Sequence, residues 1–210
     1  MTTRVVVVRH GQTYGNIGGL FCGHSETELT PLGIVQARAA GRRLADVAFD
    51  AAYASDLSRA SQTADYVLEG RTGLRPTLDP GLREMYYGEW EARPGSEIGK
   101  ETPDLLRDFF QARVHAAPGG ETLQQVRERT AAAVRRTVEA HTGGTVLVVS
   151  HGNAIMAMVA EFLRLPVEAT WSFAVDNTSI TRMEFSRSGR FTLSGFNDAA
   201  HIHSLAEATA

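Results

Sequence analysis

The sequence predicts an α/β protein, a three-layer α/β/α sandwich built on a mostly parallel sheet with one antiparallel strand. Short apolar runs at residues 5–8 and 146–149, each ended by turn residues, are typical of strands buried in parallel sheets. Segments with helical spacing alternate with such strands, which places helices on both faces of the sheet. With 210 residues the chain can bury a full core, and we expect a single domain over residues 1–210.

A long loop and then a helix are predicted after the first strand. Residues 11–27 are rich in glycine and small polar residues, and loops of that length are usually functional. Thr30 is the predicted N-cap of a helix whose first residue is Pro31. The predicted buried side of this helix carries Leu32, Val35, Ala39 and Leu44.

The remaining elements continue the alternation. A strand at residues 50–54 precedes a helix at 57–68, with Asp56 as its N-cap and Gly70 closing it. Further along the chain we expect a strand at 75–78, helices at 102–114 and 121–141, a strand ending at Ser150, a helix at 153–163, and two alternating runs at 178–185 and 190–196. The four residues that join the last two runs give a hairpin signal, which supplies the antiparallel strand.

The charge and the cysteine content exclude several classes of protein. A net charge of -3 and a pI near 6.2 provide no general attraction for nucleic acid or for an anionic membrane. Cys22 is the only cysteine, so no internal disulfide can form, and this fits a reducing compartment. We found no secretion signal and no apolar stretch long enough for a membrane span. We therefore expect a cytoplasmic protein with no nucleic-acid or membrane partner, and the sequence leaves a homodimer open.

Two histidines follow the two clearest strands, and each is followed by glycine. His10 comes after residues 5–8 and Arg9, and His151 comes after residues 146–149 and Ser150. If these strands are parallel neighbours, both histidines leave the sheet at the same edge. Open α/β sheets bind their ligands at that carboxyl edge. The sequence therefore predicts a site with two imidazoles.

Arg9 and Gly11 indicate which ligand such a site would accept. An arginine next to His10 offers a permanent planar cation beside a nucleophile or base, and Gly11 lets the backbone approach a ligand closely. The obvious target is a phosphoryl group. The alternatives are a core histidine next to a surface arginine, or a zinc or iron site formed by both histidines with nearby carboxylates. No metal-ligand spacing occurs, and Arg9 would repel a divalent cation.

Arg59 lies in the first turn of its predicted helix. A cation there opposes the helix dipole at a cost of roughly 0.3–1 kcal/mol. An anion bound at the helix N-terminus would satisfy both the arginine and the free N–H groups. Surface or salt-bridge roles are expected instead for Arg42, Arg43, Arg71 and Arg83.

Three carboxylates occur in the segment 82–91. Hydrolysis of a phosphate ester requires that the leaving alkoxide be protonated, and a carboxylic acid can do this. The residues alone do not choose among Glu84, Glu89 and Glu91, and a solvated charge is the alternative for each.

Taken in order, these segments resemble the histidine phosphatase superfamily, or phosphoglycerate mutase-like family, over essentially the whole chain. The resemblance is carried by Arg9-His10-Gly11, Phe21-Cys22-Gly23, Leu29-Thr30-Pro31-Leu32-Gly33, residues 55–64, Leu82-Arg83-Glu84, Gly120-Glu121-Thr122, Ser150-His151-Gly152, and Asn197-Asp198 with His201. A lone Arg-His-Gly is weak evidence, but the ordered set is strong.

The resemblance implies a mechanism and a set of site residues. His10 would be the nucleophile that takes the phosphoryl group, and Glu84 would be the general acid, which removes the ambiguity among the three carboxylates. The phosphoryl oxygens would be bound by Arg9, Arg59 and His151. The predicted substrate-binding residues are Asn16, Gly11, Cys22, Gly23 and Gly152. The resemblance implies no metal and no other cofactor.

The segment after the acid favours the phosphatase branch of this family over its mutases. Glycolytic mutases carry a longer insertion there with a basic, substrate-gripping motif, whereas residues 87–91 here are followed by a short segment. Ala92 departs from the glycine that the phosphatase branch usually has. We expect a phosphomonoester hydrolase acting on a small phosphorylated metabolite. The alternatives are a phosphoglycerate mutase and a non-enzymatic module that binds phospho-ligands.

The residues that contact the leaving group are the least defined. Phe21, His24, Tyr86 and Trp90 are candidates for the pocket, although large aromatic residues are more often part of the core. Lys100, Arg93 and Arg113 could meet an anionic leaving group, with solvated faces as the alternative.

Overall fold

A six-stranded sheet in the order β3-β2-β4-β1-β5-β6 forms the centre of the computed structural model, which describes residues 1–202. Residues 203–210 of the predicted domain lie outside the described residues. The strands are β1 (Thr2–Arg9), β2 (Ala51–Ala54), β3 (Pro76–Leu78), β4 (Thr145–Ser150), β5 (Ile180–Ser186) and β6 (Phe191–Asp198). The pairs β3/β2, β2/β4 and β4/β1 are parallel, and β5 runs antiparallel to both of its neighbours, β1 and β6. The predicted α/β class with one antiparallel strand is confirmed.

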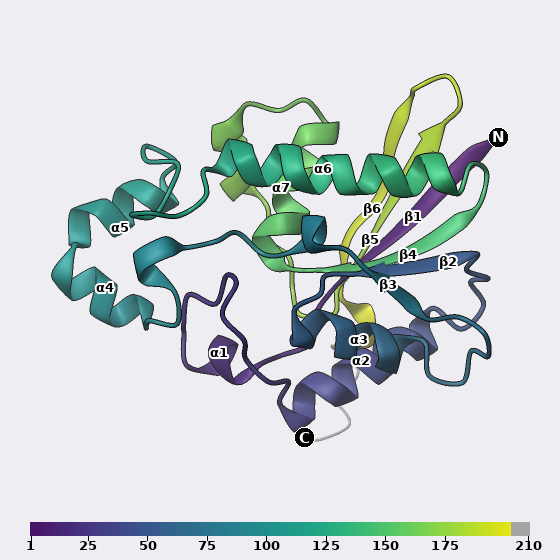
Figure 1. Cartoon of the computed structure of the whole chain (residues 1–210), viewed down its shortest axis with the longest axis horizontal. Helices are drawn as coiled ribbons and strands as arrows, with labels where there is room; N and C mark the ends of the chain where they lie inside the picture. The colour runs from purple at the N-terminus through teal and green to yellow at the C-terminus, as the bar shows by residue number, and fades with distance from the viewer. Residues whose placement is uncertain (203–210) are drawn as a thin grey trace.

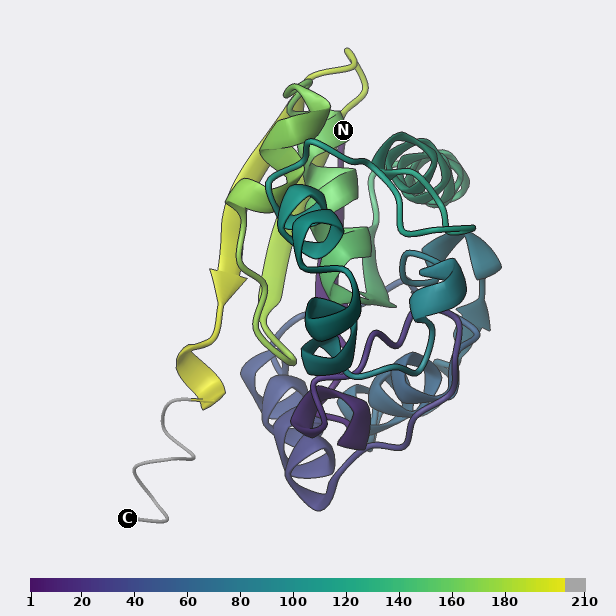
Figure 2. The ribbon, with the colours of Figure 1, turned by 90° about the vertical axis from the view of Figure 1, so that its left-hand side faces the viewer.

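Helices cover both faces of this sheet. The α-helices are α1 (Tyr14–Ile17), α2 (Pro31–Arg43), α3 (Ser58–Val67), α4 (Gly95–Glu101), α5 (Pro103–Phe110), α6 (Leu123–Ala140) and α7 (Gly152–Phe162). Short 3₁₀ helices form at η1 (Pro80–Leu82), η2 (Gly88–Trp90) and η3 (Val167–Ser172). Figure 1 shows α2 and α3 on one side of the sheet and α6 and α7 on the other, and Figure 2 shows the same layers from the side. The arrangement is a three-layer sandwich, as predicted.

The alternation of side chains along the strands divides the core into two layers. Val6 and Val8 pack with alanines of α2 and α3, whereas Val5 and Val7 pack with α6, α7 and the aromatic side chains of β5 and β6. A third cluster, which includes Trp90 and Phe109, lies around α4, α5 and the start of α6. In Figure 1, α1, α4 and α5 extend beyond the end of the sheet at which β1 finishes. These segments therefore lie next to the carboxyl edge of the sheet, where the site is predicted.

The buried side of α2 differs from the prediction. Ala39 and Leu44 are buried, but Leu32 and Val35 are 46% and 43% exposed. Gly33, in the first turn of α2, instead lies against the backbone of the loop after β1. Close contact between two backbones requires a residue without a side chain, and this contact, rather than the size of the apolar residues, sets the rotation of the helix.

Two predicted helix boundaries were wrong. Asp56 does not cap α3, which begins at Ser58, because its carboxylate binds Arg83 at 2.7 Å (Nε) and 2.5 Å (Nη2). The helix predicted at 102–114 is two helices, α4 and α5, with Thr102 between them in a non-helical conformation. Pro103 explains the break, since proline disfavours a helical residue before it and lacks an N–H.

None of the helices within residues 1–202 is both long enough and apolar enough to span a bilayer.

We expect Gly33→Ala to destabilise the fold. In an unhindered helix this change stabilises by about 1 kcal/mol. Here the new Cβ would lie 2.1 Å from the carbonyl oxygen of Gln12, so we expect a loss of about 1–3 kcal/mol in the free energy of unfolding. Urea unfolding measures it, and Val35→Ala on the exposed side of α2 is the control. A Gly33→Ala variant as stable as the parent would show that the two backbones separate freely.

Candidate active site

The pairing of β1 with β4 brings the two predicted histidines together. Arg9 lies opposite Ser150 in the register, and the N–H of His10 donates to the carbonyl of Ser150 at 2.9 Å. The rings of His10 and His151 have centroids 5.1 Å apart, and both residues are buried. The prediction that the two strands are parallel neighbours is confirmed.

His10 is held in one tautomer. Its Nδ1 lies 2.7 Å from the carbonyl oxygen of Gly11, and because a carbonyl only accepts, Nδ1 carries the proton. Burial, with Arg9 and Arg59 nearby, holds the pKa of His10 well below its usual range. At neutral pH the ring is therefore uncharged, and Nε2 has a free lone pair.

Arg9 and Arg59 supply the positive charge of the site. Arg9 donates through Nη1 to the carbonyl of Val175 at 2.6 Å, and its buried Nε has no hydrogen-bond partner among the described residues. Arg59 is 1% exposed and donates to the carbonyls of Ser25, Cys22 and Gly23 at 2.7–3.0 Å. Burial lowers the pKa of both guanidinium groups, and the charge of Glu84 opposes that shift most strongly. Arg59 thus fixes the loop at residues 22–25 beside His10.

The predicted anion site at the start of α3 is taken by a side chain of the protein. The carboxylate of Glu26 accepts from the backbone N–H of Ser58 at 3.1 Å and from its hydroxyl. The charge of Arg59 is met by loop carbonyls and nearby carboxylates. Glu26 therefore meets the N–H of Ser58, whereas Arg59 lines the cavity, and an anion bound by Arg59 stays a prediction.

The structure distinguishes the three candidate carboxylates. Glu84 is buried, and its oxygens accept from the backbone N–H groups of Met85, Asn153 and Ala154 at 2.8–3.1 Å. Two of these donors belong to the first turn of α7, so Glu84 lies at the positive end of that helix. Glu89 is exposed.

Glu91 organises the loops next to the site. It accepts from the backbone N–H groups of His24, Ser25 and Tyr87 at 2.9–3.0 Å. Although burial opposes ionisation, a hydrogen bond from the hydroxyl of Ser25, together with these backbone hydrogen bonds, leaves the pKa of Glu91 below its usual value. Of the three carboxylates, Glu84 is the one that lines the cavity.

A cavity of about 260 Å³ opens at this edge of the sheet. The predicted site residues that line it are Arg9, His10, Asn16, Cys22, Arg59, Glu84 and Gly152. His151, Gly11 and Gly23 do not line it. His151 is fully buried, and neither ring nitrogen has a hydrogen-bond partner among the described residues. Burial and the adjacent cations hold the pKa of His151 well below its usual range.

The three predicted glycines have different structural roles. A Cβ on Gly11 would lie 2.4 Å from the carbonyl oxygen of Gly33, so Gly11 packs closely against α2. A Cβ on Gly23 would meet the carboxylate of Glu91 at 2.1 Å. On Gly152 it would lie 3.4 Å from Nε of Arg9, inside the cavity, so this glycine keeps space open beside the arginine. Substrate contact by these glycines stays a prediction.

Tyr87 and Asn153 also line the cavity, and Tyr87 was not predicted from the sequence as a site residue. The buried hydroxyl of Tyr87 accepts from Nδ2 of Asn153. Burial, together with Glu84, raises the pKa of Tyr87 well above its usual value. The neighbouring Tyr86 is exposed, and no sequence signal separates two adjacent tyrosines.

Of the four predicted pocket aromatics, Phe21 lines the cavity. Trp90 belongs to the core around Phe109, and Tyr86 packs against the ring of His24. For Trp90, Tyr86 and His24 the pocket prediction was wrong, because Trp90 is packed in the core and the other two rings pair with each other outside the cavity lining.

The segment before β5 hydrogen-bonds to the end of β1 and its neighbouring loop. Asn177 donates through Nδ2 to the carbonyl of His10 at 3.0 Å and to Oδ1 of Asn16 at 3.2 Å. Oδ1 of Asn16 also accepts from Thr13, which leaves Nδ2 of Asn16 as a donor for a ligand. Asp176 and Asn197 hydrogen-bond each other twice, at 2.7 and 3.0 Å. The late Asn197 therefore positions the segment that supports His10.

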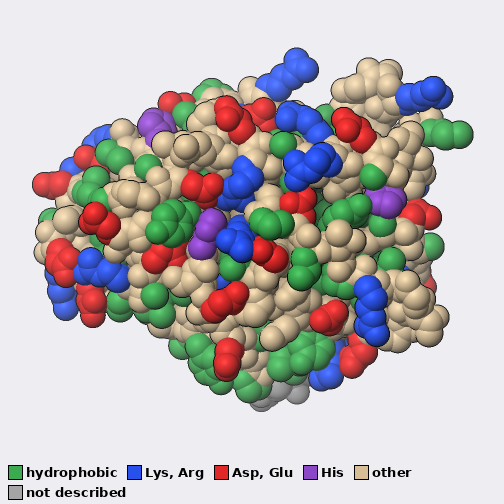
Figure 3. Space-filling view, viewed as in Figure 1, with side chains coloured by type: hydrophobic (Ala, Val, Ile, Leu, Met, Phe, Trp, Pro, Cys, Tyr) green, Lys and Arg blue, Asp and Glu red, His purple; other side chains and the backbone are tan. Residues whose placement is uncertain are grey.

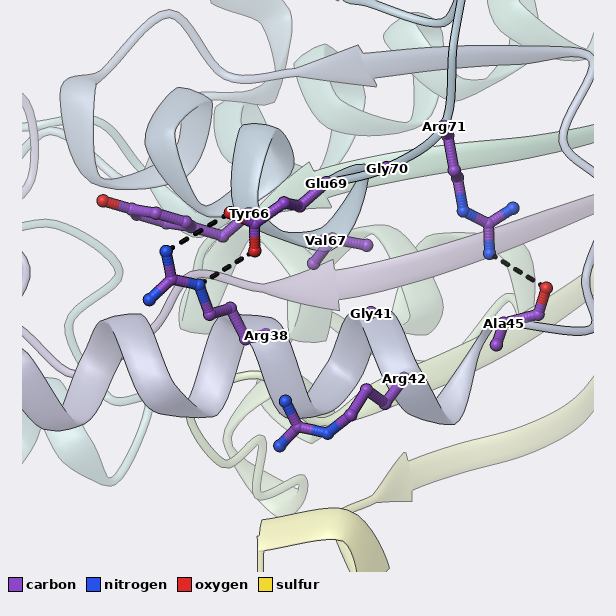
Figure 4. Close-up of a pocket in the computed structure, with 9 residues that line it drawn as sticks. All are labelled: Arg38, Gly41, Arg42, Ala45, Tyr66, Val67, Glu69, Gly70 and Arg71. Carbon is purple, nitrogen blue, oxygen red and sulfur yellow. Dashed lines mark hydrogen bonds and ion pairs between the residues drawn. The ribbon is translucent and has the colours of Figure 1, made fainter.

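A larger cavity of about 360 Å³ lies between α2 and α3 (Figure 4). Two of its three arginines are structural: Arg38 binds Glu69, and Arg71 donates to carbonyls at the end of α2, including that of Leu44. It contains no histidine or cysteine. Within residues 1–202, no three His, Cys, Asp or Glu side chains form a group that could hold a metal ion.

Comparisons with known proteins agree with this geometry. The family model described as "Histidine phosphatase superfamily (branch 1)" matches residues 5–199. The chain is 36% identical over 174 residues to adenosylcobalamin/alpha-ribazole phosphatase of Escherichia coli (strain K12), covering 82% of this chain and 85% of the relative. It is 30% identical to the probable phosphoglycerate mutase GpmB of Yersinia pestis (strain Pestoides F), covering 95% and 94%. The solved structure of Bacillus stearothermophilus YhfR superposes with a TM-score of 0.90 at 33% identity, covering 95% of this chain and 99% of that one.

The two buried histidines predict a loss of stability in acid. Their pKa values lie well below 6.5 in the folded chain, so below pH 6.5 the unfolded chain binds more protons. The free energy of unfolding should therefore fall as the pH drops below 6.5, by about 1.4 kcal/mol per pH unit for each histidine. Urea unfolding between pH 8 and pH 5 measures this slope.

The double variant His10→Gln/His151→Gln is the comparison. It should show a much flatter slope over this range, because the carboxylates with lowered pKa values are retained and respond at lower pH. An unchanged slope would mean that these two rings do not set the acid stability.

Proposed function

Because the chain belongs to the histidine phosphatase superfamily, we propose that it hydrolyses phosphate monoesters of small metabolites through a phosphohistidine on His10. The observation that carries the proposal is the state of His10. The carbonyl of Gly11 fixes the proton on Nδ1, so the free lone pair of Nε2 is available next to the buried guanidinium groups of Arg9 and Arg59. This arrangement suits a nucleophile that attacks a dianion.

In the first step Nε2 of His10 attacks phosphorus and the phosphorus–oxygen bond to the leaving group breaks. Glu84, in its protonated form, gives its proton to the departing oxygen. Arg9 and Arg59 offset the charge on the phosphoryl oxygens, and His151 can give these oxygens a hydrogen bond that it does not make within the described residues. The products are the free alcohol and phosphohistidine.

In the second step water attacks the phosphohistidine. The carboxylate of Glu84 accepts a proton from this water, and the bond between Nε2 and phosphorus breaks, releasing inorganic phosphate. His10 and Glu84 return to their starting forms. The positive charge required in both steps comes from side chains of the chain, so the proposed reaction needs no metal ion or cofactor.

Hydrolysis rather than mutase activity is supported by the segment after Glu84. Arg93 is the basic residue nearest to η2 in the segment that follows it, and it binds Glu101 at 2.6 Å instead of lining the cavity. No substrate-gripping cation reaches the site from this segment. Phosphoglycerate mutase remains the second candidate, favoured by the likeness to GpmB. A module that only binds phospho-ligands is opposed by the complete set of His10, Glu84 and the two arginines.

The surface charge and the free cysteine support proposals about the partners and the cellular location of the protein. Figure 3 shows acidic and basic side chains intermixed over one face, which supports a protein without a nucleic-acid partner. Cys22 is a free thiol, which is consistent with the cytoplasm. We propose a cytoplasmic enzyme formed by one domain.

Replacing the nucleophile should abolish the covalent intermediate. We expect His10→Ala to lower kcat about 10³-fold or more and to form no acid-labile phosphoenzyme with a labelled phosphate ester. His141→Ala is the matched control, because His141 hydrogen-bonds Tyr53 away from the cavity. Full turnover by His10→Ala would exclude the mechanism.

Replacing the acid should separate the two steps. With alkyl phosphates, we expect Glu84→Gln to slow the first step by about 10²–10⁴-fold, since the alkoxide must be protonated to leave. With p-nitrophenyl phosphate the leaving group departs as nitrophenolate without a proton, so rapid mixing should show a burst of nitrophenolate and accumulated phosphoenzyme. Glu89→Gln, at an exposed position, should behave as the parent. Equal losses with both kinds of ester would argue against Glu84 as the proton donor.

A further inference from the structure

The active-site cavity is lined by two chemically distinct groups of side chains. The polar group surrounds the reacting atoms and includes Arg9, His10, Arg59 and Glu84. The second group is apolar and comprises Leu20, Phe21, Phe110, Met156, Trp171 and Val175. We infer that this second group binds the leaving alcohol, and that the preferred substrates are phosphate esters of uncharged, ring-bearing alcohols. This inference rests on the proposed function.

Three aromatic side chains form a continuous surface, which we call the aromatic wall. Phe21 and Phe110 have ring centroids 6.1 Å apart, and Phe110 and Trp171 have centroids 6.0 Å apart. These rings come from the loop after α1, from the end of α5 and from η3. Their convergence on the cavity that holds His10 places a ring-binding surface beside the site of phosphoryl transfer.

The wall has apolar surface left to bury. Phe110 is 52% exposed, an unusual state for phenylalanine in a folded chain. An apolar ring that covers it removes apolar surface of both partners from water, and aromatic rings gain further from their edge and face contacts. Contact with the substrate would therefore stabilise the complex.

The lining of this cavity offers no further cation for a second anionic group. Arg9 and Arg59 are its cations, and both already donate to backbone carbonyls beside the phosphoryl site. Arg93 and Arg113, which could have met an anionic leaving group, bind Glu101 and Asp108 instead, and neither lines the cavity. Lys100 does not line it either.

A carboxylate on the leaving group would therefore lie against apolar side chains and near Glu84. Burying a charge without a cation to pair with it is unfavourable. Phosphoglycerates should accordingly be poor substrates, and this separates the chain from an enzyme that interconverts them.

The test compares three esters whose leaving groups are all alkoxides: ethyl phosphate, 2-phenylethyl phosphate and 3-phosphoglycerate. We expect kcat/KM for 2-phenylethyl phosphate to exceed that for ethyl phosphate by about tenfold or more, as burial of a ring in a hydrophobic pocket allows. The value for 3-phosphoglycerate should be the lowest. Equal values for the phenylethyl and ethyl esters, or a higher value for 3-phosphoglycerate, would overturn the inference.

Variants of the aromatic wall test whether the preference for the phenylethyl ester depends on these side chains. Phe110→Ala and Trp171→Ala should each lower the ratio of the phenylethyl to the ethyl value by about threefold to tenfold. Phe110→Lys should raise the ratio of 3-phosphoglycerate to 2-phenylethyl phosphate, because it supplies the missing cation. Phe110 is half exposed, so its variants keep the test decisive if Trp171→Ala does not fold.

The control is Leu78→Ala, at a residue of β3 that is exposed to the same degree as Phe110 but does not line the cavity. It should leave all three values unchanged, and unchanged ratios in the wall variants would refute the role of the wall. If none of the esters is hydrolysed and no phosphoenzyme forms, the proposed function fails. If the esters are hydrolysed without the expected preference, only the inference about the leaving group fails.

Discussion

The in-register parallel pairing of β1 with β4 is the interaction on which the site depends. It places His10 and His151 at adjacent strand ends, with their rings in contact. It also fixes the start of α7, since that helix begins at Gly152, directly after β4. The first turn of α7 then supplies two of the backbone donors that hold Glu84. One strand pair therefore sets the positions of the proposed nucleophile, the second imidazole and the proposed acid.

The ionisable groups of the site are held mainly by backbone atoms rather than by one another. Carbonyl groups hold His10, Arg9 and Arg59, and backbone N–H groups hold Glu84. A guanidinium that is already fixed needs little rearrangement when negative charge develops on a phosphoryl group, and such preorganisation is the main source of electrostatic catalysis. Burial adds to this, because it keeps His10 uncharged and therefore nucleophilic. The same burial predicts that the fold loses stability in acid.

The sequence predicted the features of the site that depend on local signals. A β-branched run followed by a His-Gly pair identifies a buried strand and its end, and the hairpin near the C-terminus has its own turn signal. The errors arose where a distant contact outweighed a local preference. Asp56 is a good helix cap in isolation, but Arg83 binds it, and Glu26 takes the helix terminus instead. The rotation of α2 depends on the contact of Gly33 with a loop that precedes it in the chain.

The parts of the site that could not be predicted are those that distinguish one substrate from another. Phosphatases and a probable mutase are both similar to this chain, so residues that hold a phosphoryl group do not separate the two activities. The residues of the aromatic wall lie in a loop, at the end of α5 and in η3, and none of them belongs to a strand of the sheet. Its side chains can therefore change without moving His10 or Glu84. This separation allows one phosphoryl-transfer site to serve different alcohols, and it locates the choice of substrate in Phe21, Phe110 and Trp171.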